Sequence, residues 1–297
     1  ILPSFTIISC VLQIIRSGAT PVLVDSDPLT WNMDVNQIKT KITSKTKAIM
    51  VVHIYGLPVD MDPVLKLCSH YGLKLIEDAA ELIGQTYKGL PCGSFGDVST
   101  VSFYPNKHIT TGEGGMILTD DDSIAETTRS LRNLCFQSNK RFVHERLGWN
   151  MRMNNLQAAV GVAQLERLDE FLNKKRWIGQ QYNDLFSDLK GVQLPLFSTE
   201  YAQNIYWVYG IVLDDNLSID AEEFMRQLLK KGIGSRPFFC PMHQQPILKK
   251  NGLFKNESFP VAERLYRRGF YIPSGLNLNL EKIKKVSSAV KEIIKNL

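Results

Sequence analysis

The stretch from Leu73 to Thr119 decides what kind of protein this chain can be. A short apolar run ends in Glu77-Asp78-Ala79-Ala80, a second segment reads Ser102-Phe103-Tyr104-Pro105-Asn106-Lys107, and Thr111-Gly112-Glu113-Gly114-Gly115 follows. The stretch offers a carboxylate at the end of one predicted strand, a hydroxyl and an amine at the end of another, and glycines just beyond. This set of groups indicates a site for an aldehyde cofactor.

Working outward, the chain alternates between predicted strands and helices. The branched apolar run at residues 48–52 is typical of a central parallel strand. Asp62-Pro63 predicts the start of a helix and Gly72 its end, before a strand at residues 73–77. This βαβ unit predicts an α/β fold, with functional groups such as Asp78 beyond the carboxyl ends of the strands.

The second half of the chain has a different pattern. Asn154-Asn155-Leu156-Gln157 predicts a capping box that opens one long helix through Leu172, bridging two domains. Beyond Gly191, mixed strands and helices predict a smaller α+β domain. We therefore expect a large domain at residues 1–172 and a small C-terminal domain at residues 173–297. Further predicted helices lie at 6–16, 34–41, 121–132, 260–268, 281–297 and from Asp220, and further strands at 21–24, 97–103, 116–118 and 205–213.

Composition sets limits on the function. With 297 residues, 44% hydrophobic and 22% charged, the chain is expected to be a folded, soluble globular protein. A net charge of +5 is too small to indicate a nucleic-acid partner, but it is compatible with an anionic small substrate. Five scattered cysteines without a CxxC pair indicate neither a disulfide framework nor a metal site, and favour a cytoplasmic location. No apolar run reaches the roughly 18 residues of a membrane span.

Each polar group of the central stretch has two interpretations. A carboxylate at Asp78 could pair with a nearby basic side chain, or with the ring nitrogen of pyridoxal phosphate. Lys107 could be solvated, or could form a Schiff base with that cofactor. Ser102 could bind a phosphate or merely end its strand, and the glycines could form an ordinary turn. The order of the set, rather than any one member, favours the cofactor.

The ordered motifs resemble the DegT/StrS family of pyridoxal-phosphate sugar aminotransferases, a branch of the aspartate aminotransferase fold, over essentially the whole chain. The matching blocks are Pro3-Ser4-Phe5-Thr6, His53-Ile54-Tyr55-Gly56, Glu77-Asp78-Ala79-Ala80-Glu81, Gly93-Ser94-Phe95-Gly96-Asp97, Ser102 to Lys107, Thr110 to Gly115 and Gly148-Trp149-Asn150-Met151-Arg152-Met153. Within the family, residues 236–246 and 271–276 are most similar to the GDP-perosamine synthase subgroup.

The resemblance implies roles for particular residues. Lys107 would hold the cofactor as a Schiff base and move the proton, Asp78 would pair with the pyridine nitrogen, and Ser102 would bind the phosphate. Glu81 would lie near the ring hydroxyl. Asn150 would reach the cofactor phosphate of the neighbouring subunit, which implies a homodimer with shared active sites.

The resemblance also implies the reaction. Glutamate would donate its amino group, and a 4-keto-6-deoxy sugar nucleotide, with GDP-4-keto-6-deoxymannose as the first expectation, would accept it. Arg236 and His243 would line the sugar-nucleotide pocket, or would brace an aromatic loop. No metal is implied. Other sugar nucleotides and a non-catalytic regulatory role remain alternatives.

Three departures from the family pattern bear on activity. Ile7 stands where relatives often have an aromatic ring against the cofactor. The strand-like start at Ile1 predicts a missing N-terminal segment, which in the family supplies a phosphate-binding turn, so an inactive fragment is also an alternative. His108 raises the possibility of the dehydratase branch, where histidine replaces the lysine, but the distance to Gly112-Glu113-Gly114-Gly115 places Lys107 in the lysine position.

Overall fold

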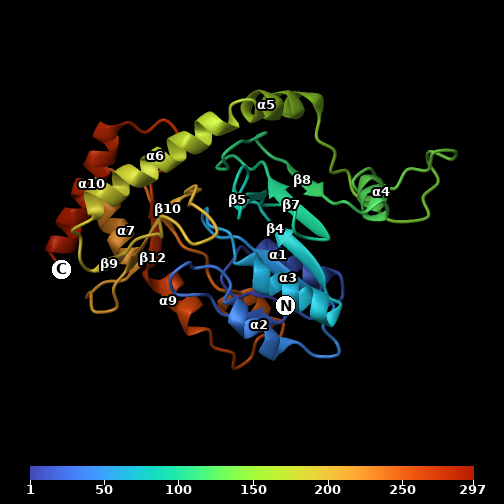
Figure 1. Cartoon of the computed structure of the whole chain (residues 1–297), viewed down its shortest axis with the longest axis horizontal. Coiled ribbons are helices and arrows are strands. Elements are labelled where there is room, and N and C mark those ends of the chain that lie inside the picture. Colours follow the sequence, from blue (N-terminus) through green and yellow to red (C-terminus); the bar gives the residue numbers. More distant parts are fainter.

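The computed structural model describes residues 1–297, and two sheets organise it (Figure 1). The larger sheet has the order β3-β4-β7-β8, in which β3, β4 and β7 are parallel and β8 is antiparallel. The smaller sheet, β11-β12-β10-β9, is antiparallel. The pairs β1-β2 and β5-β6 form separate two-stranded sheets, and β1 lies beside β3. The strands are β1 (Leu2–Pro3), β2 (Leu23–Val24), β3 (Ala48–Val52), β4 (Lys74–Asp78), β5 (Thr86–Tyr87), β6 (Leu90–Pro91), β7 (Val98–Ser102), β8 (Gly115–Leu118), β9 (Val192–Gln193), β10 (Tyr209–Leu213), β11 (Arg236–Pro237) and β12 (Gly269–Ile272).

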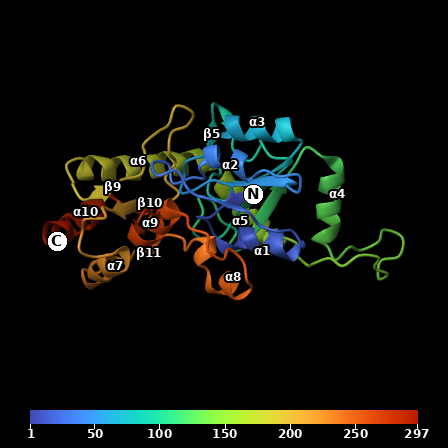
Figure 2. The same cartoon turned by 90° about the horizontal axis from the view of Figure 1, so that it is seen from below.

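The helices surround both sheets, and none of them is long and apolar enough to cross a bilayer. Figures 1 and 2 show α6 running from the larger sheet to the C-terminal helices, while α4 and the chain after it project at the opposite end. The helices are α1 (Ile8–Arg16), α2 (Val35–Lys41), α3 (Met61–Tyr71), α4 (Asp122–Leu131), α5 (Asn155–Leu165), α6 (Leu168–Phe186), α7 (Ala221–Lys230), α8 (Pro246–Lys250), α9 (Pro260–Arg268) and α10 (Leu280–Lys295), with a 3-10 turn η1 (Met242–Gln244).

The predicted βαβ unit is confirmed as β3-α3-β4. Helix α3 ends at Tyr71, and Gly72 then takes a φ of 63°, a left-handed conformation that glycine adopts without strain. In the parallel register, Val52 pairs with Asp78, and Asp78 pairs with Thr100 of β7. Asp78 is therefore the last residue of β4 and lies at the carboxyl edge of the larger sheet, as predicted.

Two large hydrophobic clusters hold the elements together. One joins Phe5 and Tyr55 from the first part of the chain to Trp207 and Phe238 from the second part. The other lies around the smaller sheet and is enclosed by α6, α7 and α10. Because the first cluster contains side chains from both halves, packing ties them together closely. The division of the chain after residue 172 stays a prediction.

The prediction of one long helix through Leu172 is wrong, because α5 and α6 are separate helices. The capping box is confirmed: the side chains of Asn154 and Gln157 each bond the other residue's backbone N–H. The chain leaves helical geometry at Arg167, where φ is −111° and ψ is 13°. The guanidinium of Arg167 bonds both carboxylate oxygens of Glu170 in the first turn of α6. Helix α6 therefore begins separately at Leu168, with this ion pair across its first turn.

Candidate active site

Asp78 receives hydrogen bonds from two different elements. Its Oδ1 accepts a bond of 3.0 Å from the backbone N–H of Ala80, and its Oδ2 accepts one of 3.3 Å from the Sγ of Cys10 on α1. Burial and the Asp78 carboxylate both raise the pKa of the Cys10 thiol, so the thiol keeps its proton and acts as a donor. Helix α1 and strand β4 thus fix the carboxylate between them.

Lys107 follows β7 in a loop and is largely enclosed. Its Nζ makes no hydrogen bond within the chain, but lies 3.9 Å from the ring centroid of Trp207. The indole Nε1 of Trp207 also donates a bond of 2.9 Å to the carbonyl oxygen of Asn106. Burial lowers the pKa of Lys107, against the opposing effects of the Glu81 and Asp78 carboxylates. The site therefore contains an amine that loses its proton more easily than a surface lysine does.

Glu81 completes a group of two carboxylates and one amine. It is 7% exposed, and its Oε2 accepts a bond of 2.7 Å from the backbone N–H of Tyr55. Burial raises the pKa of Glu81 to about 8, although the nearby Lys107 acts to lower it. The Glu81 carboxyl therefore keeps its proton to a higher pH than an exposed glutamate does. The hydroxyl of Tyr55 is buried without a hydrogen-bond partner.

Ser102 is the last residue of β7, and the glycines face it from β8. Its Oγ accepts a 3.2 Å bond from the backbone N–H of Tyr104, and Ser102 pairs with Gly115 in the sheet. Gly114 has a φ of 154°, and a Cβ there would lie 2.5 Å from the Oγ1 of Thr111. This close approach requires glycine, so the glycine cluster forms a tight turn beside the hydroxyl.

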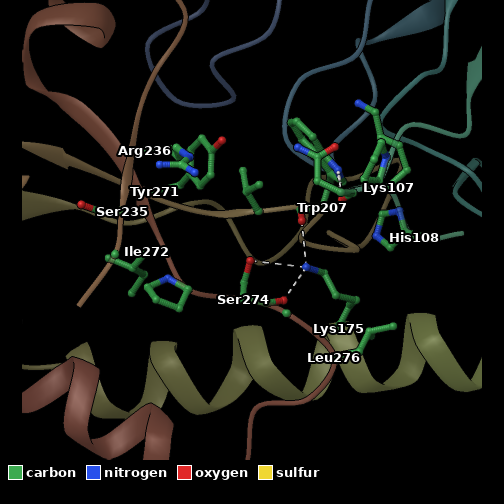
Figure 3. A pocket seen from close by; sticks show the side chains of 16 residues that line it. Lys107, His108, Lys175, Trp207, Ser235, Arg236, Tyr271, Ile272, Ser274 and Leu276 are labelled. Atoms are coloured by element: carbon green, nitrogen blue, oxygen red, sulfur yellow. Dashed lines mark hydrogen bonds between the residues drawn. The ribbon is translucent and has the colours of Figure 1, made fainter. Parts of the chain in front are cut away.

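A cavity of about 500 Å³ lies in front of Lys107, at the junction of the two sheets (Figure 3). Arg236 on β11 is among the residues that line it, and its contact with a sugar nucleotide stays a prediction. Its other polar and aromatic lining residues include His108, Lys175, Trp207, Tyr271 and Ser274. Lys107 and Arg236 therefore both contribute to the wall of this cavity.

His243 lies outside this lining and is 4% exposed. Its Nδ1 lies 2.8 Å from the Oγ of Ser4, and its Nε2 lies 2.9 Å from the Oε1 of Glu263. These two contacts connect the residue after β1, η1 and α9. The contact with substrate predicted for His243 stays a prediction.

Asn150 is also separate from the group around Lys107. It forms a β-bridge with Asn133, and its Oδ1 accepts a 2.9 Å bond from Nε of Arg152. It is exposed and lies in the segment between α4 and α5. Within one chain, the exposed side chain of Asn150 therefore contacts Arg152 and not the group around Lys107.

Sequence reasoning missed Trp207 and Lys175 as site residues. Trp207 lies within an apolar run and has the signature of an ordinary core residue, although its indole supports Lys107. Lys175 lies between Lys174 and Arg176, in what reads as a solvated charged run. Only the tertiary structure distinguishes it from its two neighbours.

The residues present fit the predicted cofactor. An amine without a hydrogen-bond partner, a carboxylate oriented by two donors and a buried tyrosine hydroxyl without a partner match a group with an aldehyde, a ring nitrogen and polar substituents. Ser102 and the adjacent turn supply a hydroxyl and backbone N–H groups suited to a phosphate.

Comparison with known proteins agrees with this geometry. Residues 1–291 match the DegT/DnrJ/EryC1/StrS aminotransferase family. The chain belongs to this family. GDP-perosamine synthase of Caulobacter vibrioides is 39% identical over 294 residues, which cover 99% of this chain and 78% of that protein. GDP-perosamine synthase of Escherichia coli O157:H7 is 39% identical over 292 residues, covering 98% and 78%.

Solved structures confirm the predicted α/β aminotransferase fold. DesV of S. venezuelae is 30% identical, with a TM-score of 0.90 over 100% of this chain and 78% of that one. Helicobacter pylori PseC shares the fold, with a TM-score of 0.94 at 24% identity and coverage of 100% and 80%. The chain is therefore a pyridoxal-phosphate-dependent sugar aminotransferase, which confirms the predicted enzyme class and cofactor.

Proposed function

We propose that this enzyme transfers the amino group of glutamate to a 4-keto-6-deoxy sugar nucleotide. GDP-4-keto-6-deoxymannose is the first candidate, which would give GDP-perosamine and 2-oxoglutarate. The observation that carries the proposal is that the Glu81 and Asp78 carboxylates act on the Lys107 amine, while Lys107 and Arg236 line the same cavity. The 39% identity to GDP-perosamine synthases supports the choice of sugar nucleotide.

Pyridoxal phosphate, when bound, supplies an aldehyde that takes up an amino group and a ring that withdraws electrons. Lys107 would hold the aldehyde carbon and then move a proton between cofactor and substrate carbons, because its lowered pKa makes the amine available as a base. Asp78, oriented by Cys10, would keep the ring nitrogen protonated. Ser102 would hold the phosphate, and Glu81 would face the ring hydroxyl.

Two further residues would serve the sugar nucleotide. The guanidinium of Arg236 would bind an anionic group of the substrate in the cavity, because arginine pairs well with phosphate and carboxylate. His243, which contacts Ser4 and Glu263 and lies outside the cavity lining, would act by bracing the C-terminal segment that carries Arg236. In the overall reaction, glutamate loses its amino group and its Cα proton, and water supplies the keto oxygen of 2-oxoglutarate. The sugar carbonyl carbon gains the amino group and a proton while its oxygen leaves as water, so no net water is consumed.

The active form is proposed to be a cytoplasmic homodimer in which Asn150 reaches the phosphate site of the partner. Large apolar side chains near Asn150 support an interface there. Phe142 is 80% exposed, Leu147 is 91% exposed and Leu156 on α5 is 81% exposed. Large apolar side chains with this degree of exposure are typical of association surfaces. The five free cysteines support the cytoplasmic location.

Absorption spectroscopy tests the reaction. Purified protein with pyridoxal phosphate should show a visible band that glutamate bleaches, and a 4-keto sugar nucleotide should then restore the band. Mass spectrometry of products from a panel of keto-sugar nucleotides identifies the acceptor. Lys107→Ala should abolish the bleaching, whereas Lys45→Ala, an exposed lysine, should leave it intact. Bleaching at an unchanged rate in Lys107→Ala would overturn the assignment.

A further inference from the structure

The amine of Lys175 is enclosed at the wall of the cavity. This residue lies on α6 and is 6% exposed. Its Nζ donates hydrogen bonds to the carbonyl oxygen of Trp207 at 2.8 Å, to the carbonyl oxygen of Ser274 at 2.7 Å, and to the Oγ of Ser274 at 3.4 Å (Figure 3). An ammonium has three protons, so these three acceptors satisfy it fully.

Trp207 connects this amine to Lys107. The face of its indole lies 3.9 Å from Nζ of Lys107, and its Nε1 holds the carbonyl of Asn106, the residue before that lysine. Lys175 thus fixes the backbone of the same residue whose side chain supports Lys107 and its loop. The path from one amine to the other consists of one hydrogen bond and one ring contact, and the bond from Trp207 to Asn106 adds a link to the loop.

Helix α6 also holds the opposite wall of the cavity, through a second side chain. Tyr182 lies two turns after Lys175 on α6, and its hydroxyl donates a 2.7 Å bond to the carbonyl of Pro273. Helix α6 therefore holds both Pro273 and Ser274, which line the cavity directly after β12. Since the same helix also holds Trp207, it sets the distance between the two walls.

Lys175 does not act on the pKa of Lys107 by direct charge repulsion. The charges that act on the pKa of Lys107 are the carboxylates of Glu81 and Asp78. The other titratable groups that line the cavity are Arg236, Tyr271 and His108. Burial and Lys175 lower the pKa of His108 to about 3, so its imidazole is neutral near pH 7. Burial lowers the pKa of Lys175 itself to about 7.

We propose that Lys175 is a positioning residue, which holds Trp207 under the amine of Lys107 and thereby sets the basicity of that amine. The inference rests on the proposed function only in taking Lys107 as the reacting amine. A buried ammonium is costly compared with a methionine of similar length. A methionine could not replace the hydrogen bond that Lys175 donates to the backbone of Trp207, because methionine has no donor.

The test uses the full chain without cofactor, so that it is independent of transamination. Protein labelled with 5-fluorotryptophan is examined by ¹⁹F NMR, with the Trp207 signal assigned through Trp207→Phe. The pH midpoint for acylation of Lys107 is measured in parallel by mass spectrometry. Lys175→Met is compared with Lys174→Met, which changes the neighbouring lysine of the same helix and preserves helix propensity.

In Lys175→Met, the Trp207 signal should shift or broaden, and the midpoint of Lys107 should fall by about 0.5 to 1 pH unit, because the ring no longer favours the ammonium. Lys174→Met should change neither. In a Trp207→Leu background, Lys175→Met should have no further effect on the midpoint, since the connecting ring is absent. In Lys175→Arg, the Lys107 midpoint should lie between that of Lys175→Met and that of the wild type, because arginine keeps a charged donor.

A lower melting temperature with an unchanged Trp207 signal and Lys107 midpoint would overturn the proposal, as would an equal shift in the Trp207→Leu background. Lys175→Gln, which keeps one donor, replaces the methionine variant if that variant does not fold. Failure of glutamate to bleach the cofactor band would contradict the proposed function alone. The cofactor-free measurements would still decide the role of Lys175.

Discussion

The Nε2 of His53 lies 3.1 Å from the Oε1 of Glu77, and both side chains are completely buried. The Nδ1 of His53 accepts a bond from the backbone N–H of Val59, so the proton is on Nε2 and the imidazole donates to Glu77. Glu77 also accepts bonds from the backbone N–H groups of Gly93 and Phe95. One buried carboxylate thus joins β3, β4 and the glycine-containing loop before β7.

We predict that Glu77→Gln lowers the free energy of unfolding by about 2–4 kcal/mol at pH 7. The NH2 group of glutamine would face the N–H groups that now donate to the carboxylate, and some of these donors would lose their acceptor. Burial alone would raise the pKa of Glu77, but His53 and the backbone donors lower it to about 2. The stabilisation is therefore complete above about pH 4.5 and is lost as the pH falls towards 2. Urea unfolding across this range measures it, and parallel pH curves for both proteins would contradict the prediction. Glu126→Gln, an exposed change on α4, is the control.

Glu81 should give the opposite pH dependence. Its folded pKa is raised to about 8 from an ordinary value near 4.5, so the unfolded chain ionises first and the native state loses stability as the pH rises through this interval. Glu81→Gln carries no charge. Without cofactor, its advantage in free energy of unfolding over the wild type should grow from about pH 4.5 to about 8, then level off. A constant difference would show that Glu81 is ionised throughout. Glu113→Gln, at an exposed position, should show no such trend.

Asp78→Asn should lower the rate of the glutamate half-reaction by about 10²- to 10³-fold, because the ring nitrogen would lose the charge that keeps it protonated. Stopped-flow bleaching of the cofactor band measures this rate. Cys10→Ser preserves a donor to the Asp78 carboxylate and should retain most of the rate. If both variants slowed equally, the hydrogen bond from α1, rather than the carboxylate charge, would be responsible.

Arg236→Gln should raise the KM for the substrate that it binds by about 10- to 150-fold, the range expected for a lost charge-assisted hydrogen bond, with a smaller change in kcat. Separate titrations with glutamate and with the sugar nucleotide show which substrate depends on the guanidinium. Arg226→Gln, on the exposed face of α7, is the matched control. An unchanged KM for both substrates would exclude Arg236 from binding.

Much of the larger sheet could be predicted because its signals are local. The apolar run of β3, the capping acid of α3 and Gly72 lie within one βαβ unit, so spacing alone placed Asp78 at the sheet edge. The order of motifs then connected Asp78 with Lys107. These predictions needed no contact between distant segments.

The remaining features depend on distant contacts. Trp207 meets Asn106 across 101 positions of sequence, and Lys175 meets Ser274 across 99. No local pattern indicates such pairings, because a buried lysine and an exposed one have the same helix propensity. The break at Arg167 was missed for a related reason, since apolar periodicity continues through it.

The hydrogen bond from Trp207 to Asn106 also determines what happens when the chain is expressed as two fragments. A chain cut between residues 172 and 173 would leave Lys107 on one piece and the indole beneath it on the other. Neither piece alone would contain a supported amine, so cofactor capture would report on the rejoining of the two halves. The active site of this enzyme would thus serve as a built-in sensor of complementation between fragments.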